Sequence, residues 1–354
     1  MAVLSKEFAQ KLRNFKEPIY LPHMHTMKSK LLLFLLMGLG VLSACKKDDV
    51  QDNNQPSNPN QPVSAADLKD TAVAYSRDIY LWYSQIPSTF NGKSYNDPDE
   101  IMTALRQYSI EPGFSGPVDR WSFAEKKAVW DGVSAGIAGD FGMDVFFRTE
   151  GDLRVKYVEK ESPAGKAGVR RSWRITKING STNITTGNAD AIVKAVWQSQ
   201  STSFTFQKPD GSSVDMTLTA GSYNERPVYM DTVYTVNGSK VGYLVFNSFM
   251  GDTTSVYNEF SRVFNRFATN NVSDVVVDLR YNGGGYVSVQ EKLANYLVTS
   301  TANGSLMMKQ QFNDKYTQYN EDTKFQKLGS LNARRLFFIV SGSTASASEL
   351  LINN

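Results

Sequence analysis

Apolar residues at helical spacing mark the start of the folded part of the chain. They recur every three or four positions, which predicts one amphipathic helix ended by Pro87, and they are Leu68, Ala72, Tyr75, Ile79, Trp82 and Ile86. Ser64 and Asp67 resemble a helix-capping pair at its N-terminus. A second apolar segment runs from Ile101 to Tyr108. Together these segments predict a small helical module over residues 64–131.

Near Gly132 the pattern changes to short strands separated by turns. One helix, Ala189–Trp197, lies among five predicted strands, which are Met143–Phe147, Leu153–Val158, Arg174–Ile178, Ser203–Gln207 and Val214–Leu218. Short strands at this spacing, with so few helices, are typical of small β domains. The pattern therefore predicts a small, partly open β-barrel over residues 132–222.

Residues 226–354 show the pattern of an α/β domain. Val241–Phe246 predicts a strand, and Val275–Leu279 and Leu336–Val340 are continuous apolar runs of the kind found in buried parallel strands. Two helices are expected between them, one with its apolar face from Val256 to Phe267 and one from Val287 to Val298. This alternating order predicts a parallel sheet with helices on its faces.

An export signal precedes the folded body. Lys28 and Lys30 are followed by an uncharged segment from Leu31 to Ala44. A helix needs about 20 apolar residues to span a bilayer, so this shorter segment is typical of a secretory signal. The segment ends in Leu-Ser-Ala-Cys, which resembles a bacterial lipobox with Cys45 as the lipidated residue.

Residues 1–44 are interpreted as upstream sequence and signal peptide, with Met27 as the true start. Residues 45–63, rich in Gln, Asn, Pro and Ser, are interpreted as a flexible tether. Lys46 directly after the cysteine resembles the sorting signal of outer-membrane lipoproteins. Such a protein would face either the periplasm or the cell surface.

Composition and charge exclude several function classes. The chain of 354 residues carries a formal charge of +3, of which residues 1–44 contribute +4, so the body is close to neutral. A neutral body argues against nucleic acid as a partner. The only histidines are His23 and His25 and the only cysteine is Cys45. Without its N-terminus the protein therefore has no Ser-His-Asp triad, no Cys-His dyad and no His/Cys zinc site, and we expect no metal or cofactor.

Two polar segments follow the predicted buried strands, at the edge where ligands of parallel sheets bind. The first runs from Asp278 to Gly285 and ends in three glycines, whose bare N–H groups suit an anion or an oxyanion. A phosphate site is the competing interpretation, but Gly-Lys-Ser/Thr and the dinucleotide glycine spacing are absent. The second, Ser341 to Glu349, places serines at the start of a helix. It is either a nucleophile loop or simply the tightly packed beginning of that helix.

Residues 132–222 resemble a PDZ domain of bacterial proteases. The resemblance rests on Ser162-Pro163-Ala164 through Val169 and on Ile175 through Gly180, although Ser172-Trp173-Arg174 replaces the usual Gly-Asp. It implies peptide capture by strand addition, with the substrate's C-terminal carboxylate held by the loop Phe141-Gly142-Met143. The alternative is a structural barrel without a ligand.

The two polar segments together are similar to the catalytic core of C-terminal processing (tail-specific) proteases, which are Ser/Lys enzymes with an inserted PDZ domain. The resemblance spans residues 64–354. It implies an α+β multidomain protein with an N-terminal helical module, a PDZ-like small β-barrel and an α/β core of ClpP/crotonase-like fold. It further implies Ser346 as the nucleophile, and Gly285 or Gly284 with the amide of Ala347 as the oxyanion hole.

The position of the general base departs from the family pattern. In the family a lysine on a strand after the serine helix is the base, whereas no lysine follows Ser346 here and the chain stops at Asn354. We therefore expect a core incomplete at its C-terminus and an inactive chain. The leading hypothesis is a lipid-anchored endopeptidase for exported polypeptides with free apolar C-termini. The alternatives are a non-catalytic peptide-binding lipoprotein and a glycan-binding surface lipoprotein.

Overall fold

The structure is a computed structural model that describes residues 65–354. The described residues form two compact units, one of residues 65–127 with 313–316 and one of residues 128–312 with 317–354. The predictions for Ser64, Cys45 and the export signal lie outside the described residues. Within residues 65–354, no helix combines the length and apolar character that crossing a lipid bilayer requires.

The first unit is helical, as the sequence predicts. Its α-helices are α2 (Ala65–Ile79) and α3 (Pro98–Leu105), and its short 3-10 helices are η1 (Tyr83–Gln85), η2 (Gly92–Ser94) and η3 (Arg106–Tyr108). Asp97 caps α3 by accepting a hydrogen bond from the Glu100 N–H. The small core of this unit contains Ala72, Ile86, Ile101 and Leu105.

The prediction of a single helix reaching Ile86 is wrong. Helix α2 ends at Ile79, and Tyr75 and Ile79 are exposed. The guanidinium of Arg77 donates to the carbonyl oxygens of Ile86 and Pro87, so the chain folds back against α2. Ile86 consequently reaches the core from a loop, which a helical periodicity cannot reveal.

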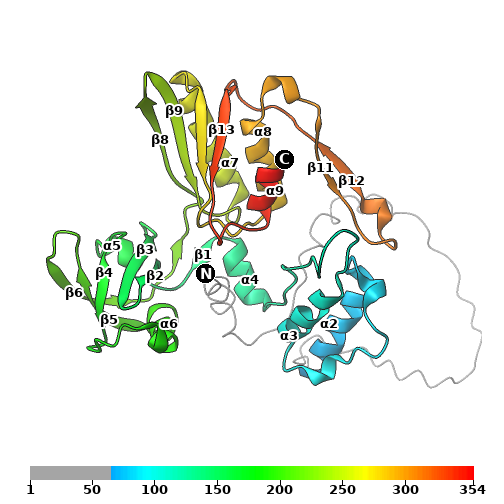
Figure 1. Cartoon of the computed structure of the whole chain (residues 1–354), viewed down its shortest axis with the longest axis horizontal. Coiled ribbons are helices and arrows are strands. Elements are labelled where there is room, and N and C mark those ends of the chain that lie inside the picture. Colours follow the sequence, from blue (N-terminus) through cyan, green and yellow to red (C-terminus); the bar gives the residue numbers. More distant parts are fainter. Residues whose placement is uncertain (1–64) are drawn as a thin grey trace, which may run out of the picture. The chain divides into compact units, whose positions relative to one another are not determined.

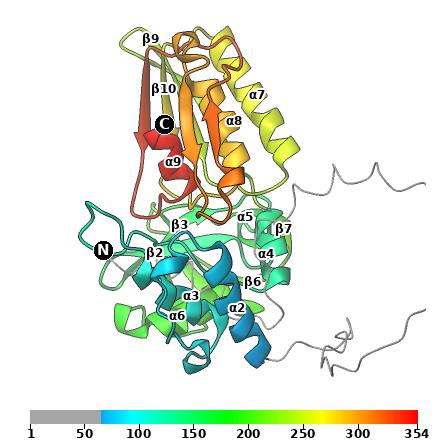
Figure 2. The ribbon, with the colours of Figure 1, turned by 90° about the vertical axis from the view of Figure 1, so that its right-hand side faces the viewer.

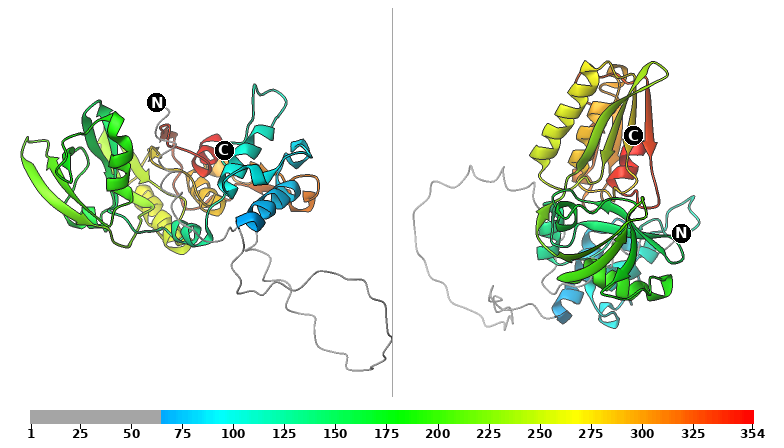
Figure 3. Two further views of the ribbon diagram at one scale, coloured as in Figure 1. Left: turned by 90° about the horizontal axis from the view of Figure 1, so that it is seen from below. Right: turned by 90° about the vertical axis from the view of Figure 1, so that its left-hand side faces the viewer.

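Residues 128–224 contain a five-stranded antiparallel sheet, seen as the green strands in Figure 1 and Figure 3. Its strand order is β2-β3-β4-β5-β6, and the strands are β2 (Met143–Thr149), β3 (Asp152–Val158), β4 (Arg174–Ile178), β5 (Ser201–Gln207) and β6 (Ser213–Thr219). Helices α4 (Lys127–Ser134), α5 (Pro163–Lys166) and α6 (Ala189–Trp197) and 3-10 helix η4 (Thr186–Asn188) accompany it, and β1 (Ile137–Ala138) pairs with β7 (Tyr223–Asn224).

All five predicted strands and the predicted helix of this region are present. The barrel is not closed, because β2 and β6 are the two edge strands of the sheet and do not pair with each other. Alternation along β5 sends Phe204 and Phe206 into the core, where they pack with Leu153 and Ile175. The opposite face of β5 is polar.

The sheet of the C-terminal region has the order β13-β10-β9-β8. Its strands are β8 (Val228–Val236), β9 (Ser239–Phe246), β10 (Asp274–Asp278) and β13 (Arg335–Ile339). The predicted parallel arrangement is confirmed for β9, β10 and β13, whereas the unpredicted β8 adds an antiparallel hairpin to β9. Figure 2 shows α7 (Thr253–Thr269) and α8 (Val287–Leu297) along this sheet, followed by α9 (Ala347–Asn353).

The core of this region lies between the sheet and α7 and α8. The predicted apolar face of α7 is fully buried there, together with Leu244, Phe246 and Val275. A hairpin of β11 (Leu306–Gln310) and β12 (Glu321–Lys324), with 3-10 helices η5 (Ser300–Ala302) and η6 (Thr317–Tyr319), was not predicted.

Leu336–Val340 is predicted to be a buried strand, and the prediction that this strand is buried is wrong. The segment does form β13 beside β10, but β13 is an edge strand of the described sheet. Phe337 is 47% exposed and Val340 is 51% exposed. A continuous apolar run predicts strand formation, and it does not show which neighbour will cover the strand.

Candidate active site

The polar segment that begins with Asp278 lies at the carboxyl end of β10. The Arg280 guanidinium donates to both Asp278 oxygens, and the Tyr243 hydroxyl donates to Oδ2 at 2.6 Å. Burial raises the pKa of the Asp278 carboxyl, but the hydrogen bonds from Arg280 and Tyr243 outweigh burial and hold that pKa below its ordinary value. The Asp278 carboxylate is therefore ionised, and the Arg280 guanidinium balances its charge at the start of the turn.

Asn282 connects this turn to two other segments. Its side chain is fully buried, donates through Nδ2 to the Phe246 carbonyl oxygen at 3.0 Å and accepts from the Gly284 N–H at 2.9 Å. Its carbonyl oxygen accepts from the Ala345 N–H and from the Ser348 hydroxyl, at 3.2 and 3.1 Å. One residue thus joins the end of β9, the glycine turn and the serine loop.

The serine loop is held against the end of β10 by further hydrogen bonds. The Thr344 hydroxyl donates to the Leu279 carbonyl oxygen at 2.8 Å, and the Ser341 hydroxyl donates to the carbonyl oxygen of Arg280. The two polar segments identified in the sequence are therefore brought together. Their contact fixes the position of the residue that precedes α9.

That residue is Ser346, which has a left-handed backbone conformation with φ of 55°. Residues other than glycine rarely adopt positive φ, and the associated strain of about 1–3 kcal/mol is concentrated at functional sites. Ser346 is exposed between the buried residues Ala345 and Ala347, and its N–H donates to Glu349 Oε2 at 3.0 Å. The serine side chain is therefore presented at the surface by a rigid backbone.

Gly284 lies directly against Ser346. A Cβ atom at position 284 would lie 2.7 Å from Ser346 Cβ and 3.0 Å from the Ala345 carbonyl oxygen, and Gly284 has a φ of +104°. Both the contact and the backbone conformation require glycine at this position.

Two N–H groups beside Ser346 are available to an oxyanion. Within the described residues, no acceptor is recorded for the N–H of Gly285 or of Ala347. The Gly284 N–H, by contrast, donates to Asn282, which favours Gly285 over Gly284 as the second donor. Gly285 is held by Phe249, whose carbonyl carbon would lie 2.4 Å from a Cβ at position 285.

The loop Phe141-Gly142-Met143 is not an open anion site in this structure. Phe141 and Met143 are 1% and 3% exposed, and Met143 pairs with Val158 in the β2–β3 ladder. The Gly142 N–H donates to the Asp140 carboxylate at 2.8 Å, so its donor is already used by an anion of the chain itself. One of the three loop amides is thus used within the chain, and the expectation that this loop holds a carboxylate stays a prediction.

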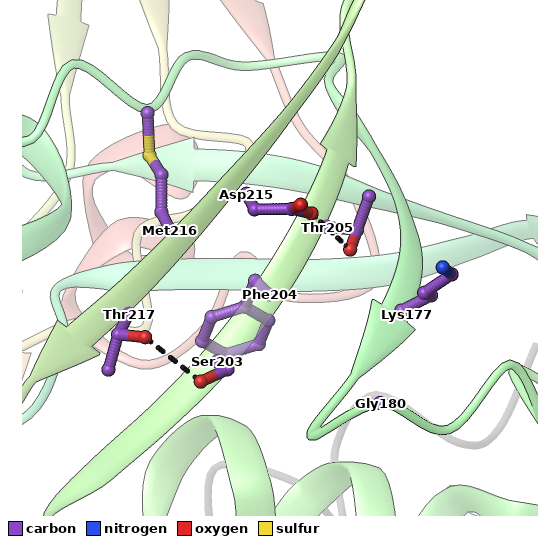
Figure 4. A pocket seen from close by; sticks show the side chains of 8 residues that line it. All are labelled: Lys177, Gly180, Ser203, Phe204, Thr205, Asp215, Met216 and Thr217. Carbon is purple, nitrogen blue, oxygen red and sulfur yellow. Dashed lines mark hydrogen bonds between the residues drawn. The ribbon is translucent and has the colours of Figure 1, made fainter.

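One surface hollow is lined by none of the residues of the two polar segments. Figure 4 shows this pocket of about 360 Å³ on the polar face of β4, β5 and β6. Ser203 and Thr217 are hydrogen-bonded across it, as are Thr205 and Asp215. These bonds pair the polar side chains of adjacent strands with one another, which is typical of a solvated sheet face.

Residues 65–354 contain no group of three or more His, Cys, Asp or Glu side chains placed to share a metal ion. The residues that sequence reasoning missed are Asn282, Phe249 and Glu349. The sequence shows Asn282 only as one residue of the segment between the strand and the glycines. Its hydrogen bonds to Phe246 and Ser348, which are distant in the sequence, appear only in the structure. Phe249 carried no sequence signal.

Comparisons with known proteins match two segments of this chain. Residues 240–354 match peptidase family S41, and residues 74–123 match the N-terminal domain of S41 peptidases. A probable CtpA-like serine protease of Staphylococcus saprophyticus is 25% identical over 279 residues, covering 77% of this chain and 53% of that protein. The carboxy-terminal processing protease CtpB of Bacillus subtilis is 26% identical over 228 residues, covering 62% and 43%.

The chain spans about half the length of these curated relatives. Among solved structures, a putative S41 protease from Bacteroides fragilis is 22% identical and has a TM-score of 0.59, covering 80% of this chain and 74% of that one. The mixed α/β fold is therefore similar to that of an S41 protease structure.

Proposed function

We propose that this chain, whose residues 240–354 match peptidase family S41, is a serine-type peptidase that cleaves peptide bonds of polypeptides with Ser346 as the nucleophile. The observation that carries the proposal is the strained, exposed Ser346 beside two N–H groups without acceptors. Strain at an exposed serine and free backbone donors serve acyl transfer, and neither contributes to the stability of the fold.

The proposed reaction follows from this geometry. Ser346 Oγ attacks the carbonyl carbon of the scissile bond, and the oxygen that gains negative charge accepts hydrogen bonds from Gly285 and Ala347. The proton of the serine hydroxyl passes to a general base and then to the leaving amine as the C–N bond breaks. Water then hydrolyses the acyl-enzyme and restores the serine.

The proposed general base is a lysine amine, neutral when its pKa is lowered by burial. No lysine follows Ser346 among the 354 residues, so the base is named here by its chemistry alone. With a lysine and no histidine in the mechanism, the activity persists at mildly alkaline pH.

Residues 132–222 are proposed to act as a PDZ-like module that presents substrates. The support is the sequence resemblance and the position of β2 at the edge of its sheet, where a polypeptide can add as a further strand. A specificity for free apolar C-termini is part of this proposal.

We also propose that the protein is an exported lipoprotein, anchored to the outer membrane through Cys45. The support is the charged and apolar pattern before Cys45. In cells, Cys45→Ser leaves unprocessed precursor without lipid, measured by fatty-acid labelling and by the mass of the mature chain. Processing and membrane retention equal to those of the parent would refute the assignment.

The peptidase activity is tested in the natural protein. We expect cleavage of an unfolded polypeptide, loss of cleavage in Ser346→Ala, and measurable activity in the matched control Ser343→Ala, because Ser343 lacks the strained backbone. Cleavage by Ser346→Ala at the parent rate would refute the nucleophile. Peptide binding without cleavage in every variant would instead favour a peptide-binding lipoprotein.

A further inference from the structure

Three cationic side chains surround the ring of Tyr281, the residue directly before Asn282 in the glycine turn. Lys156 Nζ lies 4.7 Å from the ring centroid, the Arg171 guanidinium carbon 5.6 Å and the Arg280 guanidinium carbon 6.0 Å. Lys156 is on β3 and Arg171 follows α5, so segments distant in the sequence converge on this turn. We call Tyr281, Lys156 and Arg171 the Tyr281 cluster.

Within residues 65–354, two of the three cations have no anionic partner. Arg280 is neutralised by Asp278, whereas Lys156 and Arg171 form no ion pair with any carboxylate among the described residues. Arg171 donates to the Tyr281 hydroxyl at 2.5 Å and to the Lys156 carbonyl oxygen at 3.1 Å, both of which are neutral acceptors. Arg171 is exposed and Lys156 is partly exposed, so both can reach a ligand.

The surroundings contain a further cation, Lys160, and one buried carboxyl group, Glu159, which accepts a hydrogen bond from the Tyr157 hydroxyl and whose pKa burial raises to about 7. Lys160 lies 5.4 Å from the ring centroid of Tyr229, and that ring lies 5.1 Å from the ring of Tyr157, which in turn contacts Tyr281. Cation–π contacts hold the cations in place without neutralising them, and like charges around one ring repel each other. An anion between them removes this repulsion.

We propose that the Tyr281 cluster binds a carboxylate of the polypeptide substrate, either the C-terminal group or an acidic side chain. A guanidinium and an ammonium over an aromatic face suit a carboxylate, which accepts two hydrogen bonds from an arginine. The inference rests on the proposed peptidase function and names the group that positions the substrate beside Gly285 and Ser346. It adds a cationic carboxylate site to the predicted loop at Gly142, whose own N–H is bound by Asp140.

The experiment measures binding separately from cleavage. In the full chain with Ser346→Ala, the dissociation constants of three labelled peptides are measured by fluorescence anisotropy. The first peptide has an apolar tail, one Glu and a free C-terminus, the second is its C-terminal amide, and the third carries Gln in place of Glu. The test variant is Lys156→Gln with Arg171→Gln. The control is Lys177→Gln with Lys208→Gln, which removes equal charge and one cation–π contact, that of Lys208 with Trp173.

We expect the test variant to bind the first peptide about five- to tenfold more weakly, and the control to stay within about twofold. If amidation abolishes the difference between test variant and parent, the ligand is the C-terminal carboxylate. If replacement of Glu by Gln abolishes it, the ligand is the acidic side chain. Equal affinities of test variant and control for all three peptides would overturn the proposal.

A charge-conserving variant protects the test against misfolding. Lys156→Arg with Arg171→Lys keeps both charges and is expected to bind the first peptide within about twofold of the parent. Losses as large as those of the glutamine variant would overturn the carboxylate site. Cleavage is measured separately with Ser346 intact: carboxylate-dependent binding without cleavage refutes the peptidase and leaves this site standing.

Discussion

Asn282→Ala tests whether the candidate site depends on one buried connector. The substitution leaves the Phe246 carbonyl oxygen and the Gly284 N–H without their partners, in a place that water does not reach. Each buried polar group left unpaired costs about 1–3 kcal/mol, so we expect the free energy of unfolding to fall by about 2–6 kcal/mol. Whole domains are stable by only about 5–15 kcal/mol, so the effect is large.

The assay is urea unfolding followed by circular dichroism and by tryptophan fluorescence. The control is Asn265→Ala on the exposed surface of α7, where alanine is a better helix former and stability should change little. Asn282→Asp provides a second comparison, because it keeps an acceptor for Gly284 and loses the donor to Phe246. An unfolding midpoint for Asn282→Ala equal to that of Asn265→Ala would refute the assigned role.

Three further predictions concern single positions. Gly284→Ala places a methyl group against Ser346 at positive φ, so we expect cleavage to be lost and the free energy of unfolding to fall by about 1–3 kcal/mol. The control Gly283→Ala, with no atom within 4 Å of its Cβ, should behave like the parent in both assays. Ser348→Ala removes a buried hydroxyl donor and should lower the free energy of unfolding by about 1 kcal/mol in urea titration while cleavage persists; complete loss of cleavage would contradict Ser346 as the only attacking serine. Burial raises the pKa of the Glu159 carboxyl from 4.5 to about 7, so the folded state holds a proton that the unfolded state has lost, and stability should fall as pH rises from about 4.5 to 7 and level off above it. Glu159→Gln should remove this slope in unfolding titrations at several pH values, and an unchanged slope would show that another group titrates.

Local patterns predicted most of the elements and the parallel order of three strands. Helix α7 is the clearest example, because its apolar residues recur at helical spacing along its length and all face one core. The prediction failed where the outcome depended on which contacts form, or do not form, with other parts of the chain. Arg77 folds the chain back after Ile79, and the apolar run at Leu336 forms an edge strand.

The candidate site was predicted in part for the same reason. Ser346 and the glycines stand out because strand, turn and helix signals surround them. The geometry selects Gly285 over Gly284, since the Gly284 N–H is bound by a side chain two residues away. At Gly142 the sequence shows a loop with free amides, while the structure places an aspartate from the same loop on one of them. Intramolecular partners of this kind are invisible to a motif.

The exposed edge of β13 has a consequence for the chain in solution. Beyond β10, β13 has no second neighbouring strand in the described sheet, so one row of its backbone N–H and C=O groups is open. Leu336, Phe337 and Ile339 on this strand are all more than a third exposed. An apolar open edge is a template for pairing with a strand of another molecule. Arg334 and Arg335, the charges next to it, are bound by Asp274 and offer little protection against such pairing. The 354-residue chain is therefore expected to self-associate as its concentration rises, through main-chain pairing and independently of Ser346.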